Sequence, residues 1–114
     1  TGRVALPVGV WDTVHTGMQQ FAQNNSVLKN MGISVAGKTG TAQEAKNRPD
    51  HALFVGYAPC DQPQIAVAVR IANGYGSSNA TEVGKNIFEY YFDLKSPEEL
   101  LTGEAVQADN TSTD

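Results

Sequence analysis

Hydrophobic and polar positions alternate with a period of two in three short stretches of the chain. Residues 64–72 show this most clearly, with isoleucine and valine on one side and mostly alanine on the other; residues 33–39 and 51–58 show it less regularly. Successive side chains of a strand point to opposite faces, so this period predicts β-strands. Because both faces of residues 64–72 are mostly apolar, we expect that strand to be covered on both sides, with a helix close to its alanine face.

Two longer stretches have the spacing of amphipathic helices, residues 10–23 and 80–93. In the first, we expect Trp11 and Met18 in the core and His15 as a packed, hydrogen-bonded core histidine. The apolar face expected for the second helix consists of Val83, Ile87, Phe88, Tyr91 and Leu94.

The end of the chain has a different character from the rest. The run Ser96-Pro97-Glu98-Glu99 has the serine, first-position proline and glutamate of a capping box, which predicts a short helix. Residues 102–114 lack hydrophobic positions that could form a core, and this composition is typical of a disordered tail. We therefore divide the chain into a folded part, residues 1–94, and an acidic, mostly disordered tail, residues 95–114.

The order of elements, a helix, three strands with short connections and a second helix, predicts the fold class. Short connections favour antiparallel pairing, which gives an α+β fold with a three-stranded antiparallel sheet flanked by helices. The strand at residues 64–72 is too apolar to be a stable exposed edge. Either the chain self-associates through this strand, or a longer protein supplies further strands.

Composition and charge narrow the functions further. The 114 residues suffice for one domain, and the chain does not begin with methionine, so it resembles a piece of a longer protein. Residues 1–94 carry seven basic and seven acidic side chains, so the net charge of −4 comes from the tail. A neutral body argues against nucleic-acid binding. The single cysteine, Cys60, excludes an internal disulfide, and we expect neither a metal nor a cofactor.

The run Lys38-Thr39-Gly40-Thr41 carries the chemistry that we expect of this chain. A lysine supplies a positive charge and three donors, threonine hydroxyls supply directional hydrogen bonds, and glycines let a ligand approach the backbone. At the end of a strand, these groups predict an anion-binding surface.

The same residues also match a phosphate-binding loop. Residues 32–39 fit G-x-x-x-x-G-K-[ST] literally. Such a loop lies between a strand and a helix that begins near the lysine, but here the intervening residues themselves read as a strand. A nucleotide-binding protein therefore stays a minor alternative.

Two further patterns belong to serine acyl-transferases that recognise penicillin: Ser26-x-x-Lys29, and Ser77-x-Asn79. The nucleophilic serine of such an enzyme begins a buried helix, for which residues 26–31 leave no room. The Ser77-x-Asn79 pattern falls in a glycine-rich loop, where capping of the next helix explains it. We assign neither pattern a catalytic role.

The surroundings of Lys38 resemble one family in particular. Residues 35–43, Val-Ala-Gly-Lys-Thr-Gly-Thr-Ala-Gln, are similar to the third motif of class B penicillin-binding proteins, and residues 51–59, His-Ala-Leu-Phe-Val-Gly-Tyr-Ala-Pro, to the strand that follows it. The resemblance covers about residues 8–94. It implies the C-terminal part of a larger transpeptidase fold, in which a five-stranded antiparallel sheet has helices on both faces and stands beside a helical subdomain.

The resemblance also implies roles for individual residues. Lys38 is similar to the lysine beside the substrate carboxylate and the nucleophile. Thr39 and Thr41 are similar to the residues whose hydroxyls bind the terminal carboxylate of a D-alanyl-D-alanine stem peptide or of a β-lactam. The N–H of Thr41 is similar to one of two oxyanion-hole donors. Gly37 and Gly40 would allow close approach of the substrate.

The function that the resemblance implies is that of a D,D-transpeptidase which cross-links peptidoglycan outside the bacterial membrane, anchored by an N-terminal helix absent here. The family's nucleophilic serine lies upstream of the matched region, so we expect this chain alone to be inactive. The alternative is a non-catalytic domain of the same fold that binds peptidoglycan or β-lactams as a sensor. The expected partners are stem peptides, β-lactams and the rest of the transpeptidase domain.

Overall fold

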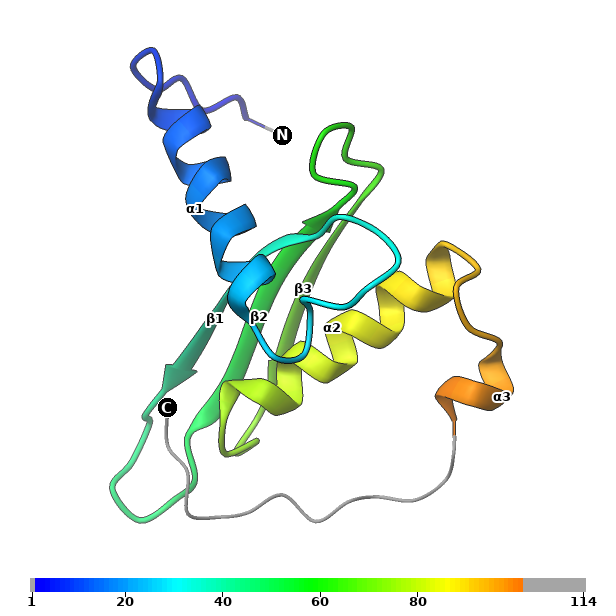
Figure 1. Ribbon diagram of the computed structural model, residues 1–114. Helices are drawn as coiled ribbons and strands as arrows, with labels where there is room; N and C mark the ends of the chain where they lie inside the picture. The colour runs from blue at the N-terminus through cyan, green and yellow to red at the C-terminus, as the bar shows by residue number, and fades with distance from the viewer. Residues whose placement is uncertain (1, 102–114) are drawn as a thin grey trace.

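The three predicted strands form one antiparallel sheet in the order β1-β2-β3, and helix α2 lies across it (Figure 1). The computed structural model describes residues 2–101. The elements, in chain order, are α1 (Val10–Asn24), β1 (Ala36–Ala42), β2 (His51–Ala58), β3 (Ile65–Ile71), α2 (Ser77–Tyr91) and α3 (Pro97–Leu100). The predicted α+β class and antiparallel order are confirmed.

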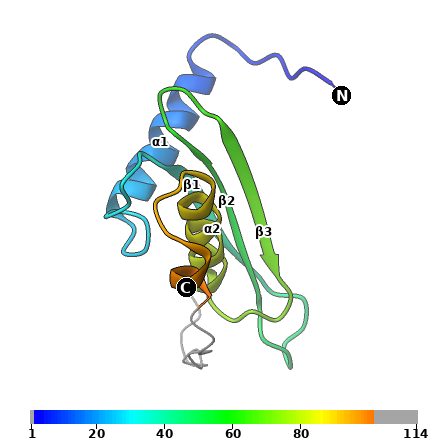
Figure 2. The ribbon, with the colours of Figure 1, turned by 90° about the vertical axis from the view of Figure 1, so that its right-hand side faces the viewer.

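The strand register assigns side chains to the two faces of the sheet. Lys38 pairs with Val55 and Val55 with Ala68, so these residues share one face. Thr39, Phe54 and Val69 share the other face, which α2 covers. Figure 2 shows α2 packed alongside the sheet, while α1 extends beyond its end.

The Phe54 ring forms the centre of the core. It is fully buried, and the ring of Phe88 from α2 meets it edge to face, with centroids 6.5 Å apart. Three glycines surround the ring: a Cβ added to Gly37, Gly56 or Gly84 would lie 2.8, 2.7 or 2.4 Å from its atoms. These distances are shorter than van der Waals contact, so only glycine fits at these positions without movement. The missing side chains therefore let the helix and the neighbouring strand close around one large aromatic group.

The first strand begins and ends three residues later than the sequence predicts. It spans Ala36–Ala42 in place of residues 33–39, because pairing with β2 continues as far as Ala42 opposite His51. The Lys38–Thr41 run therefore lies within the strand. The other two strand predictions agree with the structure to within one residue at each end.

Helix α1 forms as predicted, but its apolar face is less buried than expected. Trp11 is 45% exposed, Met18 is half-buried and His15 is exposed, so the expected core tryptophan and core histidine are wrong for this chain. The reason is the direction of the helix, whose N-terminal half rises clear of the sheet (Figure 1). Its buried residue is Ala22, near its C-terminal end.

Helix α2 begins at Ser77, three residues before the predicted start, and buries a different face. Its buried residues are Ser77, Ala80, Thr81, Gly84, Phe88 and Glu89. Of the predicted apolar face, Val83, Ile87 and Tyr91 are exposed, and only Phe88 is buried. The helix presents its small residues to the sheet because Phe54 occupies the space beneath it. Helix α3 carries the predicted capping box at Ser96 and Glu99.

Strand β3 is covered on one face only, contrary to the prediction. Its isoleucines and valines are half-buried toward α2, whereas Ala66, Ala68 and Arg70 are exposed. No described strand pairs with its outer edge, since β3 ends the order β1-β2-β3. Of the predicted tail, residues 95–114, the part from residue 102 onward lies outside the described residues, and α3 lies in the described part.

The two helical glycines provide a matched test of the packing around Phe54. An alanine Cβ at Gly84 would lie 2.4 Å from the Phe54 ring, whereas nothing lies within 4 Å of one at Gly17 in α1. We expect Gly84→Ala to lower the free energy of unfolding by about 2 kcal/mol through overpacking. Gly17→Ala should raise it by roughly 0.5 kcal/mol, because alanine is the better helix former. Urea unfolding measures both, and equal shifts in the two variants would contradict this account of the core.

Candidate functional site

The candidate site lies on β1, whose outer edge has no partner among the strands of residues 2–101. Strand alternation separates its polar side chains: Lys38 and Gly40 belong to one face, and Thr39 and Thr41 to the face covered by α2. Lys38 is exposed, while both threonines are half-buried. A ligand lying along this edge would meet the lysine from one side and the hydroxyls from the other.

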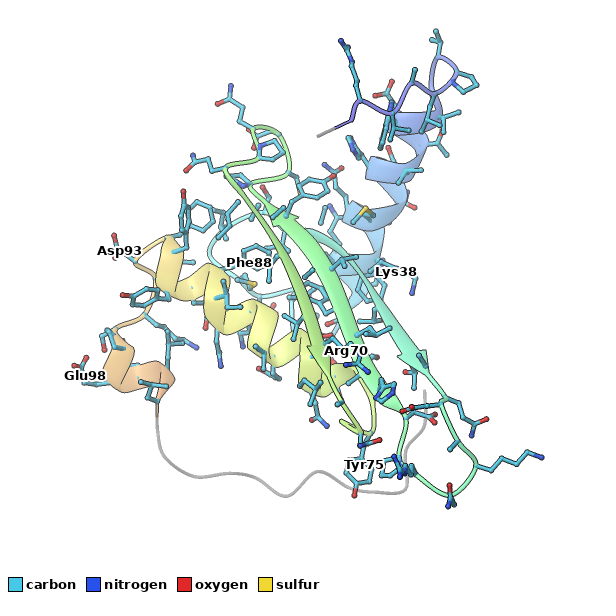
Figure 3. The ribbon with its side chains drawn as sticks, turned by 180° about the vertical axis from the view of Figure 1, so that it is seen from behind. Lys38, Arg70, Tyr75, Phe88, Asp93 and Glu98 are labelled. Carbon is cyan, nitrogen blue, oxygen red and sulfur yellow. The ribbon has the colours of Figure 1, made fainter. Side chains whose placement is uncertain are left out.

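The Lys38 ammonium has a defined position on this edge (Figure 3). Its Nζ lies 5.1 Å from the centroid of the Phe21 ring of α1, and it donates a hydrogen bond of 2.9 Å to the Thr39 carbonyl oxygen. An exposed cation–π contact of this kind contributes about 0.5–1 kcal/mol. Helix α1 therefore restrains the charge that the sequence places at the site, and Phe21 is a contact that sequence periodicity alone did not identify.

Gly37, directly before the Lys38–Thr41 run, and Gly40, within it, differ in what surrounds them. Gly37 is buried, and a Cβ there would lie 2.8 Å from Phe54 and 2.9 Å from the Val55 carbonyl oxygen. Packing alone therefore requires glycine at position 37. At Gly40 an added Cβ would make ordinary contacts of 3.6 Å with Leu53. Nothing in the packing around Gly40 excludes a side chain, so its glycine leaves room at the edge.

The competing motifs do not have the structural context that they need. Lys38 lies in the middle of β1 and no helix begins there, so the phosphate-loop interpretation is wrong. Ser26 is exposed in a turn in which the Asn25 side chain accepts hydrogen bonds from the N–H groups of Val27 and Leu28, and no helix begins in this turn. Its rejection as a helix-borne nucleophile therefore stands.

Ser77 and Asn79 belong to the first turn of α2 rather than to the predicted loop. The helix has Gly76 as its N-cap, with no capping bond from a side chain, so the capping explanation for this serine and asparagine is wrong. The Asn79 amide instead donates to the Gly74 carbonyl oxygen at 2.7 Å.

A buried histidine lies at the end of the sheet where β1 stops. His51, 8% exposed, contacts Glu44 of the β1–β2 loop and the backbone of Asn73 after β3. The sequence indicated a structural role for His51 but not its partners, because Glu44 and Asn73 are brought to it only by the fold.

The cysteine does not have the environment of a nucleophile. Burial raises the pKa of the Cys60 thiol, which reduces the thiolate fraction at neutral pH. Burial, and then the nearby Cys60, also raises the pKa of Tyr57, whose hydroxyl is buried without a hydrogen-bond partner in the described structure. Neither group is poised to react.

Within residues 2–101, no group of three or more histidine, cysteine, aspartate or glutamate side chains is arranged to hold a metal ion. No helix in the same range has both the length and the apolar character to cross a membrane.

The chain matches a family model over most of its length. Residues 3–89 match the model described as penicillin binding protein transpeptidase domain. This range contains all three strands, the Lys38–Thr41 run and nearly all of α2.

Curated relatives and solved structures agree with this match. The chain is 33% identical over 111 residues to peptidoglycan D,D-transpeptidase MrdA of Haemophilus influenzae, and the aligned region covers 80% of this chain and 17% of the relative. It is 39% identical over 71 residues to MrdA of Acinetobacter baumannii, covering 50% of this chain and 11% of that protein. The chain therefore spans less than a fifth of the length of these relatives.

Among solved structures, PBP2 of Pseudomonas aeruginosa in complex with WCK 5153 is similar with a TM-score of 0.68 and 40% identity, over 79% of this chain and 21% of that one. The imipenem acyl-enzyme complex of penicillin-binding protein A from M. tuberculosis has a TM-score of 0.64 and 28% identity, over 71% and 19% of the two chains. The sheet and helices described above are thus part of a larger fold, and the chain belongs to the penicillin-binding protein transpeptidase family.

Proposed function

We propose that this chain is the part of a peptidoglycan D,D-transpeptidase that binds the substrate carboxylate. The observation that carries the proposal is the position of the Lys38–Thr41 run on the outer edge of β1, where no strand of residues 2–101 pairs with it, inside the region matched to the transpeptidase family. The names of the relatives support the activity, and the acyl-enzyme complex among the similar structures supports β-lactam binding.

The proposed roles follow the geometry of the edge. Lys38, restrained by Phe21, supplies positive charge beside a bound carboxylate. The hydroxyls of Thr39 and Thr41 bind the carboxylate of a D-alanyl-D-alanine stem peptide or of a β-lactam, and the N–H of Thr41 serves as one oxyanion donor. Gly40 leaves room for the ligand, since nothing in the packing requires glycine there. Gly37 contributes indirectly, because its missing side chain lets Phe54 hold this strand in place.

The chemistry requires a group that we assign to the remainder of the domain. In the proposed reaction, a serine hydroxyl attacks the penultimate D-alanine carbonyl, D-alanine leaves with the transferred proton, and an amine of a second stem peptide then takes the acyl group. The exposed turn around Ser26 is unlike the helix that such a nucleophile needs. The chain therefore contributes half of an active site and is inactive alone.

The open edge of β3 indicates where the rest of the domain joins. In the described part of the chain no strand pairs with its outer edge, and this edge and the exposed alanine face suit a further strand and covering residues. We place the complete protein at the outer face of the bacterial membrane, tethered by an N-terminal helix outside this chain. A non-catalytic binding or sensor domain of the same fold is the second candidate, favoured only if the complete protein lacks the serine.

Covalent labelling by a fluorescent penicillin tests the proposal. We expect the full-length gene product to form a stable adduct that survives denaturation, because acylation of the serine is covalent. Residues 1–114 expressed alone should form none. Labelling of the isolated chain that Ser26→Ala abolishes would overturn the assignment of the nucleophile. A full-length protein that binds penicillin without forming an adduct would favour the sensor.

A matched pair of lysines controls this experiment. In the full-length protein, Lys38→Ala should lower the rate of acylation by about a hundredfold or more, comparable with the loss of one oxyanion-hole donor. Lys46, exposed in the β1–β2 loop, is the control, and Lys46→Ala should leave the rate unchanged.

The β3 edge gives a separate prediction for the chain alone. Without further strands, residues 64–72 should pair with a second copy, so light scattering at rising concentration should show dimers or larger species. Ala68→Lys places a charge on the exposed face of this strand and should reduce the association. A monodisperse monomer at high concentration would contradict the assignment.

A further inference from the structure

We propose that His51 is a positioning residue for the carboxylate site, acting through Glu44 on the segment that directly follows Thr41. This inference rests on the proposed function, because it concerns the same edge of β1. It assigns a role to a hydrogen-bonded network outside the Lys38–Thr41 run.

His51 has a place in the fold from which it can act on the site. It is the first residue of β2 and pairs with Ala42, the last residue of β1 and the neighbour of Thr41. Its side chain is only 10% exposed, whereas that of Glu44 is 61% exposed. The imidazole ring of His51 is thus buried, whereas the Glu44 side chain lies at the surface of the β1–β2 loop.

The two ring nitrogens make different contacts, and these define one tautomer. Nδ1 accepts a hydrogen bond of 3.0 Å from the Asn73 backbone N–H, so it carries no proton. In a neutral ring the proton then belongs to Nε2, which donates to Glu44 Oε2 at 2.9 Å. Each partner therefore favours the tautomer that the other one needs.

The same corner of the sheet fixes the loop after β3. The Tyr75 N–H donates to the Asp50 carbonyl oxygen at 3.1 Å, next to the bond from Asn73 to His51. Asn73 and Tyr75 both have positive φ, 53° and 64°, which is uncommon for residues other than glycine. Backbone conformations of this uncommon kind persist where the surrounding structure holds the residues in place. Figure 3 shows Tyr75 at the same end of the sheet as Arg70.

Arg70 adds a charge to the network. Its Nη2 lies 3.4 Å from His51 Nε2. Nε2 bears the proton in this tautomer, so it cannot accept a hydrogen bond from Arg70. Arg70 therefore places a positive charge beside the ring without a hydrogen bond to it. The guanidinium thus lies next to the imidazole that binds Glu44.

The consequence for the site is a fixed end of β1. Glu44 is the third residue after Thr41, so the bond to His51 limits the movement of the intervening Ala42 and Gln43. The hydroxyls of Thr39 and Thr41 must keep one spacing and direction to bind both oxygens of a planar carboxylate. Small displacements of such groups have large effects on rate. Breaking the bond should therefore affect ligands that carry a carboxylate most.

Glu44 offers a graded pair of variants for the test. In the full-length protein, Glu44→Ala removes the acceptor, whereas Glu44→Gln keeps an oxygen that can accept from Nε2. The control is Glu82→Ala, at an exposed position on α2. The readout is the acylation rate constant for a β-lactam with a free carboxylate, compared with that for its methyl ester, so the ratio reports carboxylate recognition.

We expect Glu44→Ala to lower this ratio about tenfold, Glu44→Gln to restore most of it, and Glu82→Ala to leave it unchanged. Equal losses for the acid and the ester, or no loss, would overturn the positioning role. A wild-type protein that reacts with neither compound would instead overturn the proposed function, and this inference with it. Nitrogen-15 chemical shifts of His51 give an independent reading: a proton on Nδ1 rather than Nε2 in the wild type would contradict the network.

Discussion

The contact between the Phe54 ring and three glycines holds this structure together. Gly37, Gly56 and Gly84 come from β1, β2 and α2, and a Cβ on any of them would enter the ring. Because these positions have no side chains, two strands and a helix can pack closely around the Phe54 ring. Because Gly37 immediately precedes Lys38, the same contact fixes the strand that carries the site. The site is thus positioned by the core rather than by a separate loop.

An edge strand is well suited to the proposed chemistry. Within residues 2–101 no strand pairs with the outer side of β1, and alternation brings the lysine and the threonines to opposite faces of that edge. Contacts from two directions stabilise it, with Phe21 of α1 against Lys38 and His51 of β2 beside the end of the strand. Strand β3, at the other side of the sheet, is apolar except for Arg70, and this character suits pairing with the rest of the domain.

Much of the architecture could be predicted from the sequence, because it depends on local patterns. Strand β2 agrees at both ends, and the capping box of α3 forms as its residues indicate. The faces of the helices could not be predicted in the same way. Periodicity gives weight to large apolar residues, but α2 packs through Gly84 and Ala80, since Phe54 already fills the space.

The candidate site likewise has one part that the sequence predicts and another that only the fold brings together. The Lys38–Thr41 run is contiguous, so the sequence alone is enough to propose it as a site. The Glu44–His51–Asn73 network joins residues from three segments, and only the paired ends of β1, β2 and β3 bring them together. Gly37 shows a further limit, because a glycine in a binding motif need not serve the ligand. Its packing reason becomes visible only when Phe54 is in place.

A crystal structure of the full-length protein acylated by a β-lactam tests most directly whether the edge of β1 binds the carboxylate. We expect the ligand carboxylate to lie within hydrogen-bond distance of the Thr39 and Thr41 hydroxyls on the edge of β1, with the Lys38 ammonium beside it. A covalent adduct whose carboxylate is bound elsewhere, away from this edge, would contradict it.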